Sequence, residues 1–286
     1  MSQAVAGVHA SSRSGRRMAL PRFHQVAAVV LVLVAVVAIA APWLAPYSPS
    51  AQSLDQIRPP SGAHALGTDA LGRDILSRMM YALRTDLLLI VPAAGLPMVV
   101  GTVVGTLAGY AGGVLDAAVR WIADVFQGLP LYIFLVALVA AMGRGPASLL
   151  VAFTALGWIV YARLVRTEVR RIKTAGFVEA AYLLGRSSPQ VLVQHVLPHA
   201  LKQTATYFVL DLGMALQGVA VLSFFNLGVK SGTPELGAMV ADAQIFIRSS
   251  TWMVALPGAA IVVLGVCIAA VGDHLSSRTR GESDGR

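Results

Sequence analysis

Charge and cysteine are both scarce in this sequence. Only 13% of its 286 residues are Asp, Glu, Lys or Arg, whereas 56% are hydrophobic and the mean hydropathy is +0.71. So few charges cannot cover the surface of a soluble globule of this length, which indicates an integral membrane protein. The one cysteine, Cys267, lies inside an apolar run, so an intrachain disulfide is excluded and a packing role is expected.

Several catalytic and nucleotide-binding motifs are also missing. The sequence contains no G-x-x-x-x-G-K-[ST] phosphate-binding loop, no H-E-x-x-H and no G-x-S-x-G. An intramembrane hydrolase is therefore disfavoured, and any ATP that drives this protein would be hydrolysed on another polypeptide. The net charge of +8 does not indicate nucleic acid binding, because the basic residues cluster at the edges of apolar runs rather than in one patch.

Long apolar runs dominate what is present. Six of them are each close to the ~20 residues needed to cross the hydrocarbon core of a bilayer. They cover residues 26–45, 87–110, 125–142, 146–162, 203–228 and 252–272. The sequence therefore predicts an all-α membrane protein with six transmembrane helices. The third and fourth runs are the shortest, and the GRGP stretch at 143–146 can join them as a tight pair.

The first run has a second interpretation. Its apolar core, the AIAAP stretch at 38–42 and the basic residues before it also match the pattern of a secretory signal peptide. These basic residues are Arg13, Arg16, Arg17 and Arg22. The uncharged core is longer than the ~7–15 residues typical of a signal peptide, which favours a transmembrane helix.

The distribution of basic residues predicts the orientation. If the N-terminus is cytoplasmic, the internal loops hold 15 of the 22 Lys and Arg residues, and the external loops hold the other 7. These internal loops are residues 1–25, 111–124, 163–202 and 273–286. Because cytoplasmic loops are enriched in Lys and Arg, both termini are predicted to lie in the cytoplasm.

The internal loop between the fourth and fifth runs shows a helix-turn-helix pattern. Its first part, residues 163–186, is basic and can contact anionic lipid headgroups. The helix-forming stretch FVEAAYLL leads to Gly185, which supplies the permissive backbone that ends a helix. Ser188 before Pro189 then resembles a cap followed by proline at the first position of a second helix. Such a hairpin outside the lipid offers a contact surface for a soluble partner.

This loop resembles the EAA loop of permease subunits in ATP-binding cassette importers, where it is the coupling helix that docks on a cytoplasmic ATPase. The resemblance implies ATPase docking by Glu179, Ala180, Ala181, Gly185, Leu197 and Pro198. His195 stands where the general pattern has isoleucine, as it often does in peptide-class permeases. His195 and His199 have the spacing of a helical metal pair, but Pro198 between them disfavours a metal site.

The external stretch HALGTDALGRDILSR, residues 64–78, permits two interpretations. Asp69 with Arg73, and Asp74 with Arg78, are pairs four residues apart that suit a short solvated helix. The stretch also resembles the signature of permeases for dipeptides, oligopeptides and nickel, in which ten positions match. They are His64, Leu66, Gly67, Thr68, Asp69, Gly72, Arg73, Asp74, Ser77 and Arg78. Phe225-Asn226 and the tail after Asp273 depart from that family's usual pattern.

Two further features lie inside the predicted spans. Asp211 is the only ionisable residue well inside one of them, and its insertion costs about 2.5–3.5 kcal/mol. It is therefore a candidate for the translocation path, or else a hydrogen-bonded residue at a helix interface. Gly101, Gly105 and Gly109 form a smooth stripe for close helix packing, either within the chain or against a partner subunit.

Together these features predict a permease subunit of an ATP-driven importer in the prokaryotic cytoplasmic membrane. The expected segments are a cytoplasmic tail (1–25), a first transmembrane helix (26–45), an external segment (46–84), a permease core (85–274) with the EAA loop at 166–200, and a second cytoplasmic tail (275–286). The resemblance implies as partners a second homologous permease, two cytoplasmic ATPases and an external substrate-binding protein. ATP and magnesium would bind the ATPases, so no cofactor or metal is expected on this chain.

The substrate class stays open between peptides, which are favoured, and nickel or another small solute. The alternative from another class is an ATP-independent secondary transporter or channel subunit. The sequence shows no pair of matching broken segments in its two halves, a pattern typical of secondary transporters with inverted repeats.

Overall fold

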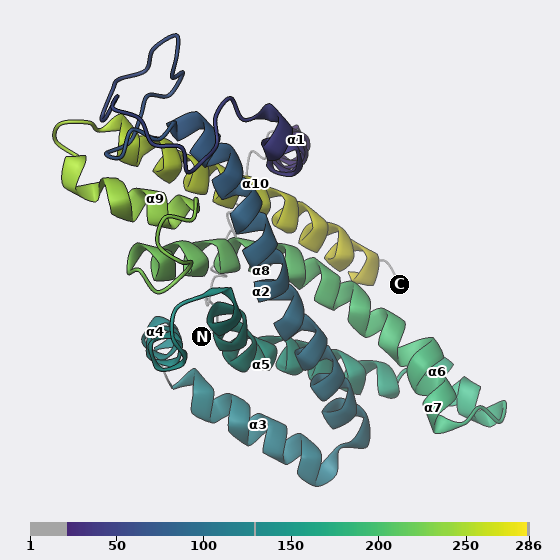
Figure 1. Cartoon of the computed structure of the whole chain (residues 1–286). Coiled ribbons are helices and arrows are strands. Elements are labelled where there is room, and N and C mark those ends of the chain that lie inside the picture. Colours follow the sequence, from purple (N-terminus) through teal and green to yellow (C-terminus); the bar gives the residue numbers. More distant parts are fainter. Residues whose placement is uncertain (1–21, 129, 285–286) are drawn as a thin grey trace, which may run out of the picture.

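The computed structural model describes residues 22–128 and 130–284, and this part of the chain is almost entirely helical (Figure 1). The elements are α1 (Phe23–Leu44), α2 (Ile75–Ala111), α3 (Gly113–Gln127), α4 (Leu131–Met142), α5 (Pro146–Lys173), α6 (Gly176–Leu183), α7 (Ser188–Val191), a π-helical turn (Leu192–Val196), α8 (Leu197–Phe224), α9 (Leu236–Ala243), a 3₁₀ turn (Gln244–Phe246) and α10 (Trp252–Asp284). The described residues contain no β-strand beyond one isolated bridge between Thr68 and Asp74. The all-α prediction is confirmed, whereas most of the predicted N-terminal tail, residues 1–21, lies outside the described residues.

Among the described residues, five helices are long and apolar enough to cross a membrane: α1, α2, α5, the continuous helix from Ser188 to Phe224, and α10. The third predicted run is not one straight helix, because α3 and α4 are bent by 93° relative to each other. Gly128 and Pro130 lie at this break, where a permissive backbone and a missing N–H interrupt helical hydrogen bonding. Residues 22–128 and 130–284 thus hold five candidate spans, or six if the bent pair forms one.

The most extensive helix interface joins α2 to α5, and the glycine stripe forms its centre. A Cβ atom on Gly105 would collide with the backbone of Ala162, and one on Gly101 would collide with the backbone of Trp158. A Cβ on Gly109 would lie 2.9 Å from the carbonyl oxygen of Arg166. The stripe therefore packs within the chain, which resolves the two alternatives that the sequence left open.

The two ends of the helical bundle carry different structures (Figure 1). At one end lie the connection from α1 to α2, helix α9 and the beginning of α10, and at the other end α6 and α7 project from the bundle. A large apolar core beside the first end contains buried residues of α2, α8, α9 and α10. A smaller core packs α6 and α7 against α5 and the start of α8. The predicted external signature and the predicted EAA loop are therefore far apart.

Candidate functional site

The segment from Gly176 to Pro198 consists of the short helix α6, a turn, and the beginning of the continuous helix that runs from Ser188 to Phe224. Helix α6 ends at Leu183, and Gly185 has a φ of +78°, a value that favours glycine. The next helix begins with a capping box, in which the backbone N–H of Ser187 donates to the side chain of Gln190 at 3.0 Å. The cap is therefore Ser187 rather than the predicted Ser188, because the Gln190 side chain pairs with Ser187, and Pro189 is the second residue of the helix, where a missing N–H costs nothing. The local sequence thus dictates both the turn and the second helix.

Buried side chains anchor this hairpin to the bundle. Val178 and Ala181 of α6, together with Val191 and Val196, pack into an anchoring core. The other buried members of this core are Val165, Val169, Ile172 and Ala200. Tyr110 at the end of α2 adds hydrogen bonds to the hydroxyl of Tyr182 (2.6 Å) and the carbonyl oxygen of Ser188 (2.9 Å). The hairpin therefore moves with α5 and α8 rather than as a loose loop.

The predicted docking residues do not all face outward. Glu179, Ala180, Gly185 and Pro198 are exposed and Leu197 is half-buried, but Ala181 is buried in the anchoring core. The tip instead exposes Leu183 and Leu184, each 84% accessible, which the sequence analysis did not single out. Their position next to Gly185 is a signal that could have identified them.

The two histidines of this segment pack locally. Nδ1 of His199 lies 2.8 Å from the carbonyl oxygen of His195, and the rings of both histidines contact Phe177. Between residues 192 and 196 the helix widens into a π-helical turn just ahead of Pro198, which lacks the N–H that a regular helix needs.

The external signature forms a compact loop at the start of α2, and one predicted pair in it is wrong. Arg73 pairs with Asp69 as expected, with 2.6 Å between Nε and Oδ2. Asp74, however, does not pair with Arg78. It caps α2 by accepting from the backbone N–H of Ser77 at 2.8 Å, and it contacts Nδ1 of His64 at 2.9 Å. A carboxylate at the N-cap accepts hydrogen bonds from the free N–H groups of the first helical turn. This capping interaction competes with the predicted ion pair between Asp74 and Arg78.

The remaining signature residues hold the preceding loop. Thr68 exchanges hydrogen bonds with Arg58, and its side chain also donates to the carbonyl oxygen of Asp55. Gly67 has a φ of +81°, and a Cβ there would collide with the backbone of Arg58. Gly72 has a φ of +71° beside the backbone of Ser53. The interpretation of this stretch as a short solvated helix fails for residues 64–74, which are loop.

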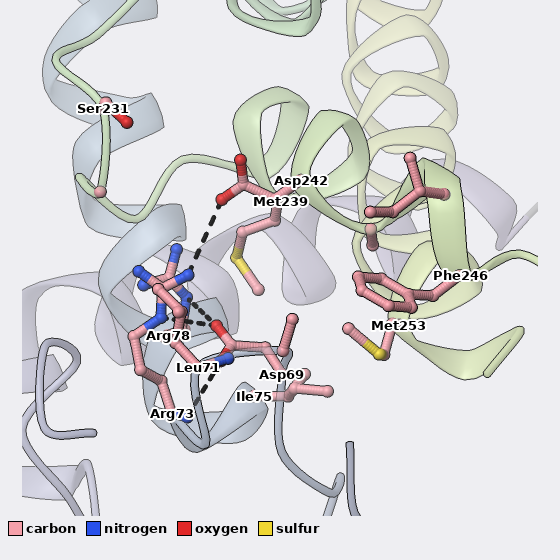
Figure 2. A pocket seen from close by; sticks show the side chains of 14 residues that line it. Asp69, Leu71, Arg73, Ile75, Arg78, Ser231, Met239, Asp242, Phe246 and Met253 are labelled. Carbon is pink, nitrogen blue, oxygen red and sulfur yellow. Dashed lines mark hydrogen bonds and ion pairs between the residues drawn. The ribbon is translucent and has the colours of Figure 1, made fainter. Parts of the chain in front are cut away.

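Arg73 and Arg78 line a pocket beside this loop, shown in Figure 2. Its volume is about 300 Å³, and α9, the 3₁₀ turn and the start of α10 complete it. Arg78 lies 3.5 Å from Asp69 and also donates to the carbonyl oxygen of Pro49, while Asp242 of α9 lies 3.8 Å from Arg73. Sequence reasoning missed the pocket because Asp242 is remote in the chain from the signature.

A buried pair of carboxyl groups was also missed. Asp86 of α2 is 2% exposed and contacts Glu235, which is 1% exposed and caps α9 through the backbone N–H groups of Gly237 and Ala238. Burial raises the pKa of the Glu235 carboxyl, and these backbone hydrogen bonds oppose that rise. Asp86 lies just before the run that begins at residue 87, so the apolar pattern alone did not reveal it as part of a long helix.

Asp211 lies at a second cavity, of about 100 Å³, between α2, α4, α5 and α8. The hydroxyl of Tyr161 donates to Oδ2 of Asp211 at 2.8 Å, and the ring of Tyr207 stands edge-on to Tyr161. Aromatic and aliphatic side chains form the rest of the wall, including Tyr132, Phe153 and Met214. Asp211 thus makes a hydrogen bond at a helix interface, as one of the two alternatives predicts, and it also lies on a cavity wall.

Comparison with known proteins finds two matching families. Residues 101–281 match the family described as "Binding-protein-dependent transport system inner membrane component", and residues 22–60 match the "N-terminal TM domain of oligopeptide transport permease C". Similar proteins include a nickel transport system permease of Escherichia coli K12 (34% identity, 93% of each chain), a probable D,D-dipeptide transport system permease of the same strain (32%; 87% of this chain and 84% of the relative) and a di/tripeptide transport system permease of Pseudomonas aeruginosa (33%; 86% and 83%).

Proposed function

This chain belongs to the family of inner membrane components of binding-protein-dependent transport systems, and on that basis we propose that it forms half of the translocation path of an ATP-driven importer. The family supplies the membrane component and leaves ATP hydrolysis to separate subunits. The proposed assembly contains this chain, a second homologous permease, two cytoplasmic ATPases that bind ATP and magnesium, and one external binding protein. An ATP-independent transporter or channel has no support in this family.

The observation that carries the proposed mechanism is the projecting hairpin of α6 and α7 (Figure 1). It exposes Glu179 and two leucines at its tip, and large exposed apolar side chains of this kind mark protein contacts. We assign it the docking site for an ATPase subunit. Because its inner side is packed into α5 and α8, closure of the ATPases would be transmitted to these helices as a rigid movement.

The orientation follows from the same assignment. If the hairpin meets a cytoplasmic ATPase, the signature loop and α9 face the external binding protein, and both termini lie in the cytoplasm. The excess of Lys and Arg in the corresponding loops supports this arrangement.

Peptides are the proposed substrate class, with nickel or another small solute as the alternative. Relatives of similar identity are named for nickel, D,D-dipeptide and di/tripeptide transport, so identity alone does not separate the two. Asp211, on the wall of the cavity between α2, α4, α5 and α8, is the proposed polar contact along the path.

Two substitutions in the hairpin test the proposed coupling. Glu179→Lys reverses an exposed charge, and Gly185→Val places a β-branched residue at a φ of +78°, where a side chain costs about 1–2 kcal/mol. Both variants should insert normally but lose bound ATPase, or retain it with hydrolysis uncoupled from uptake. Permease abundance, ATPase co-purification and substrate uptake are measured together.

Matched controls are available for both changes. Asp124→Lys reverses an exposed acid on α3, and Gly258→Val changes a glycine of α10 whose Cβ would meet no other atom within 4 Å. Both controls should keep ATPase binding and uptake. Full uptake with normal ATPase binding in Glu179→Lys and Gly185→Val would refute the coupling assignment.

A further inference from the structure

The pocket between the signature loop and α9 combines two guanidinium groups with an apolar wall, and this combination indicates the class of its ligand (Figure 2). We propose that it binds the carboxyl end of a short peptide, with Arg73 and Arg78 facing the carboxylate and the last side chain lying on the apolar wall. As a statement about the imported substrate, this inference rests on the proposed function; as a statement about ligand binding, it stands on the pocket alone.

The guanidinium groups of this pocket have more donors than the acceptors around them use. Arg73 donates from Nε to Oδ2 of Asp69 at 2.6 Å, and Nε of Arg78 lies 3.5 Å from the same oxygen. Asp242 lies 3.8 Å from Arg73, beyond hydrogen-bond distance, and its side chain is 54% exposed. Each guanidinium carries five N–H groups. Two guanidinium groups that share one close carboxylate therefore have N–H groups left to donate to a second carboxylate.

The two guanidinium groups are buried, which suits them for binding an anion. The side chains of Arg73 and Arg78 are 9% and 2% exposed, so little water screens them. Both are already held in place, Arg73 by Asp69 and Arg78 by the carbonyl oxygen of Pro49. A ligand carboxylate would therefore meet preorganised donors and would order few additional side chains.

The apolar wall and the size of the pocket limit the side chain and the length of the ligand. Ile75, Met239, Phe246 and Met253 form an apolar surface on which methionines can adapt to different side chains. A volume of about 300 Å³ is at the lower end for ligand pockets and suits a di- or tripeptide rather than a long peptide. The two guanidinium groups supply N–H donors that suit a carboxylate, and the apolar wall suits a side chain, so both parts of the pocket match a short peptide.

Titration of the full chain in lipid nanodiscs with alanyl-leucine and with its C-terminal amide tests this assignment. The free acid should bind about tenfold more tightly than the amide, because only the acid makes charge-assisted hydrogen bonds. Arg73→Gln should abolish that preference. Asp242→Asn should raise affinity for the acid about threefold, because it removes a competing carboxylate near Arg73. Arg248→Gln is the matched control, since Arg248 is exposed and lies outside the pocket.

Arg73→Gln and Asp242→Asn are expected to change the affinity for the acid in opposite directions. This difference separates an effect on binding from a loss of structure, because a misfolded chain cannot bind more tightly. Equal affinity for the acid and the amide, or unchanged binding in Arg73→Gln, would overturn the assignment. Tighter binding of N-acetyl-aspartate amide than of the dipeptide would assign the pocket to an acidic side chain of a partner protein and would also overturn it. The titration needs no ATPase, so its failure is distinguishable from failure of the importer assignment, which uptake measures.

Discussion

At the scale of single residues, Asp74 shows that the spacing of residues in the sequence does not always predict the partner of a side chain. The sequence predicts Asp74 as a surface ion-pair partner of Arg78, but the carboxylate caps α2 and contacts His64. Both arrangements are compatible with the spacing, and the choice depends on where the helix begins. Gly185 poses no such problem: a permissive backbone after a helix-forming stretch is a local property, and its φ of +78° agrees with the prediction.

Asp211 gives the first residue-scale prediction. Asp211→Asn keeps the shape of the side chain and can still accept the hydrogen bond from Tyr161, so insertion and assembly should be preserved. If the acid lines the path, uptake should fall about tenfold, since the loss of one charge-assisted contact costs about 1.5 kcal/mol. The measurement is the initial uptake rate at equal permease abundance.

Tyr161→Phe is the companion variant, because it removes the hydroxyl that contacts Asp211 and keeps the ring that packs on Tyr207. It frees the carboxylate without removing its charge, so uptake should fall less than in Asp211→Asn. Unchanged uptake kinetics in Asp211→Asn would leave Asp211 with a packing role alone.

At the scale of helices, the glycine stripe was predictable but its partner was not. Spacing of four residues puts Gly101, Gly105 and Gly109 on one face of α2, which predicts close contact with some helix. The identity of that helix depends on contacts between segments more than fifty positions apart in the chain. The same limit applies to Asp86 with Glu235, and to Arg73 with Asp242.

Gly105→Ala tests the α2 and α5 interface. Its Cβ would collide with the backbone of Ala162, which cannot move without shifting α5, so we expect a loss of about 1–3 kcal/mol in stability. Thermal unfolding in detergent measures the change. Gly265→Ala on α10 is the control, because a Cβ there meets no atom within 4 Å and should leave the unfolding temperature nearly unchanged. Equal unfolding temperatures for both variants would contradict the close packing.

The bent pair of α3 and α4 shows that hydropathy alone does not report where an apolar run bends. The apolar run at 125–142 crosses Gly128 and Pro130, and hydropathy registers polarity but not a loss of backbone hydrogen bonds. Proline is also present inside α2, at Pro92 and Pro97, and does not end that helix. A proline therefore marks a candidate break, and packing against neighbouring helices decides whether the break occurs.

At the scale of the whole molecule, the hairpin of α6 and α7 and the pocket beside α9 lie at opposite ends of the bundle (Figure 1). Helix α8 links the two ends, because the hairpin leads directly into its first residue and its last turn is followed by the loop to α9. A displacement at the hairpin can thus reach the other end through one continuous helix. The local sequence predicted the hairpin and the signature loop as separate features. The fold shows that α8 connects the two ends of the bundle at which they lie.

The orientation of this arrangement in the membrane is the last prediction. Cys267→Ser gives a cysteine-free background, in which Ser231→Cys near the pocket and Ser187→Cys at the hairpin each report one end. Ser231 and Ser187 are both exposed, so a membrane-impermeant maleimide should reach whichever residue faces the outside. In intact cells it should label Ser231→Cys alone, and after permeabilisation both, because the excess of Lys and Arg predicts a cytoplasmic hairpin. Labelling of Ser187→Cys in intact cells would invert the topology and remove the hairpin from any cytoplasmic ATPase.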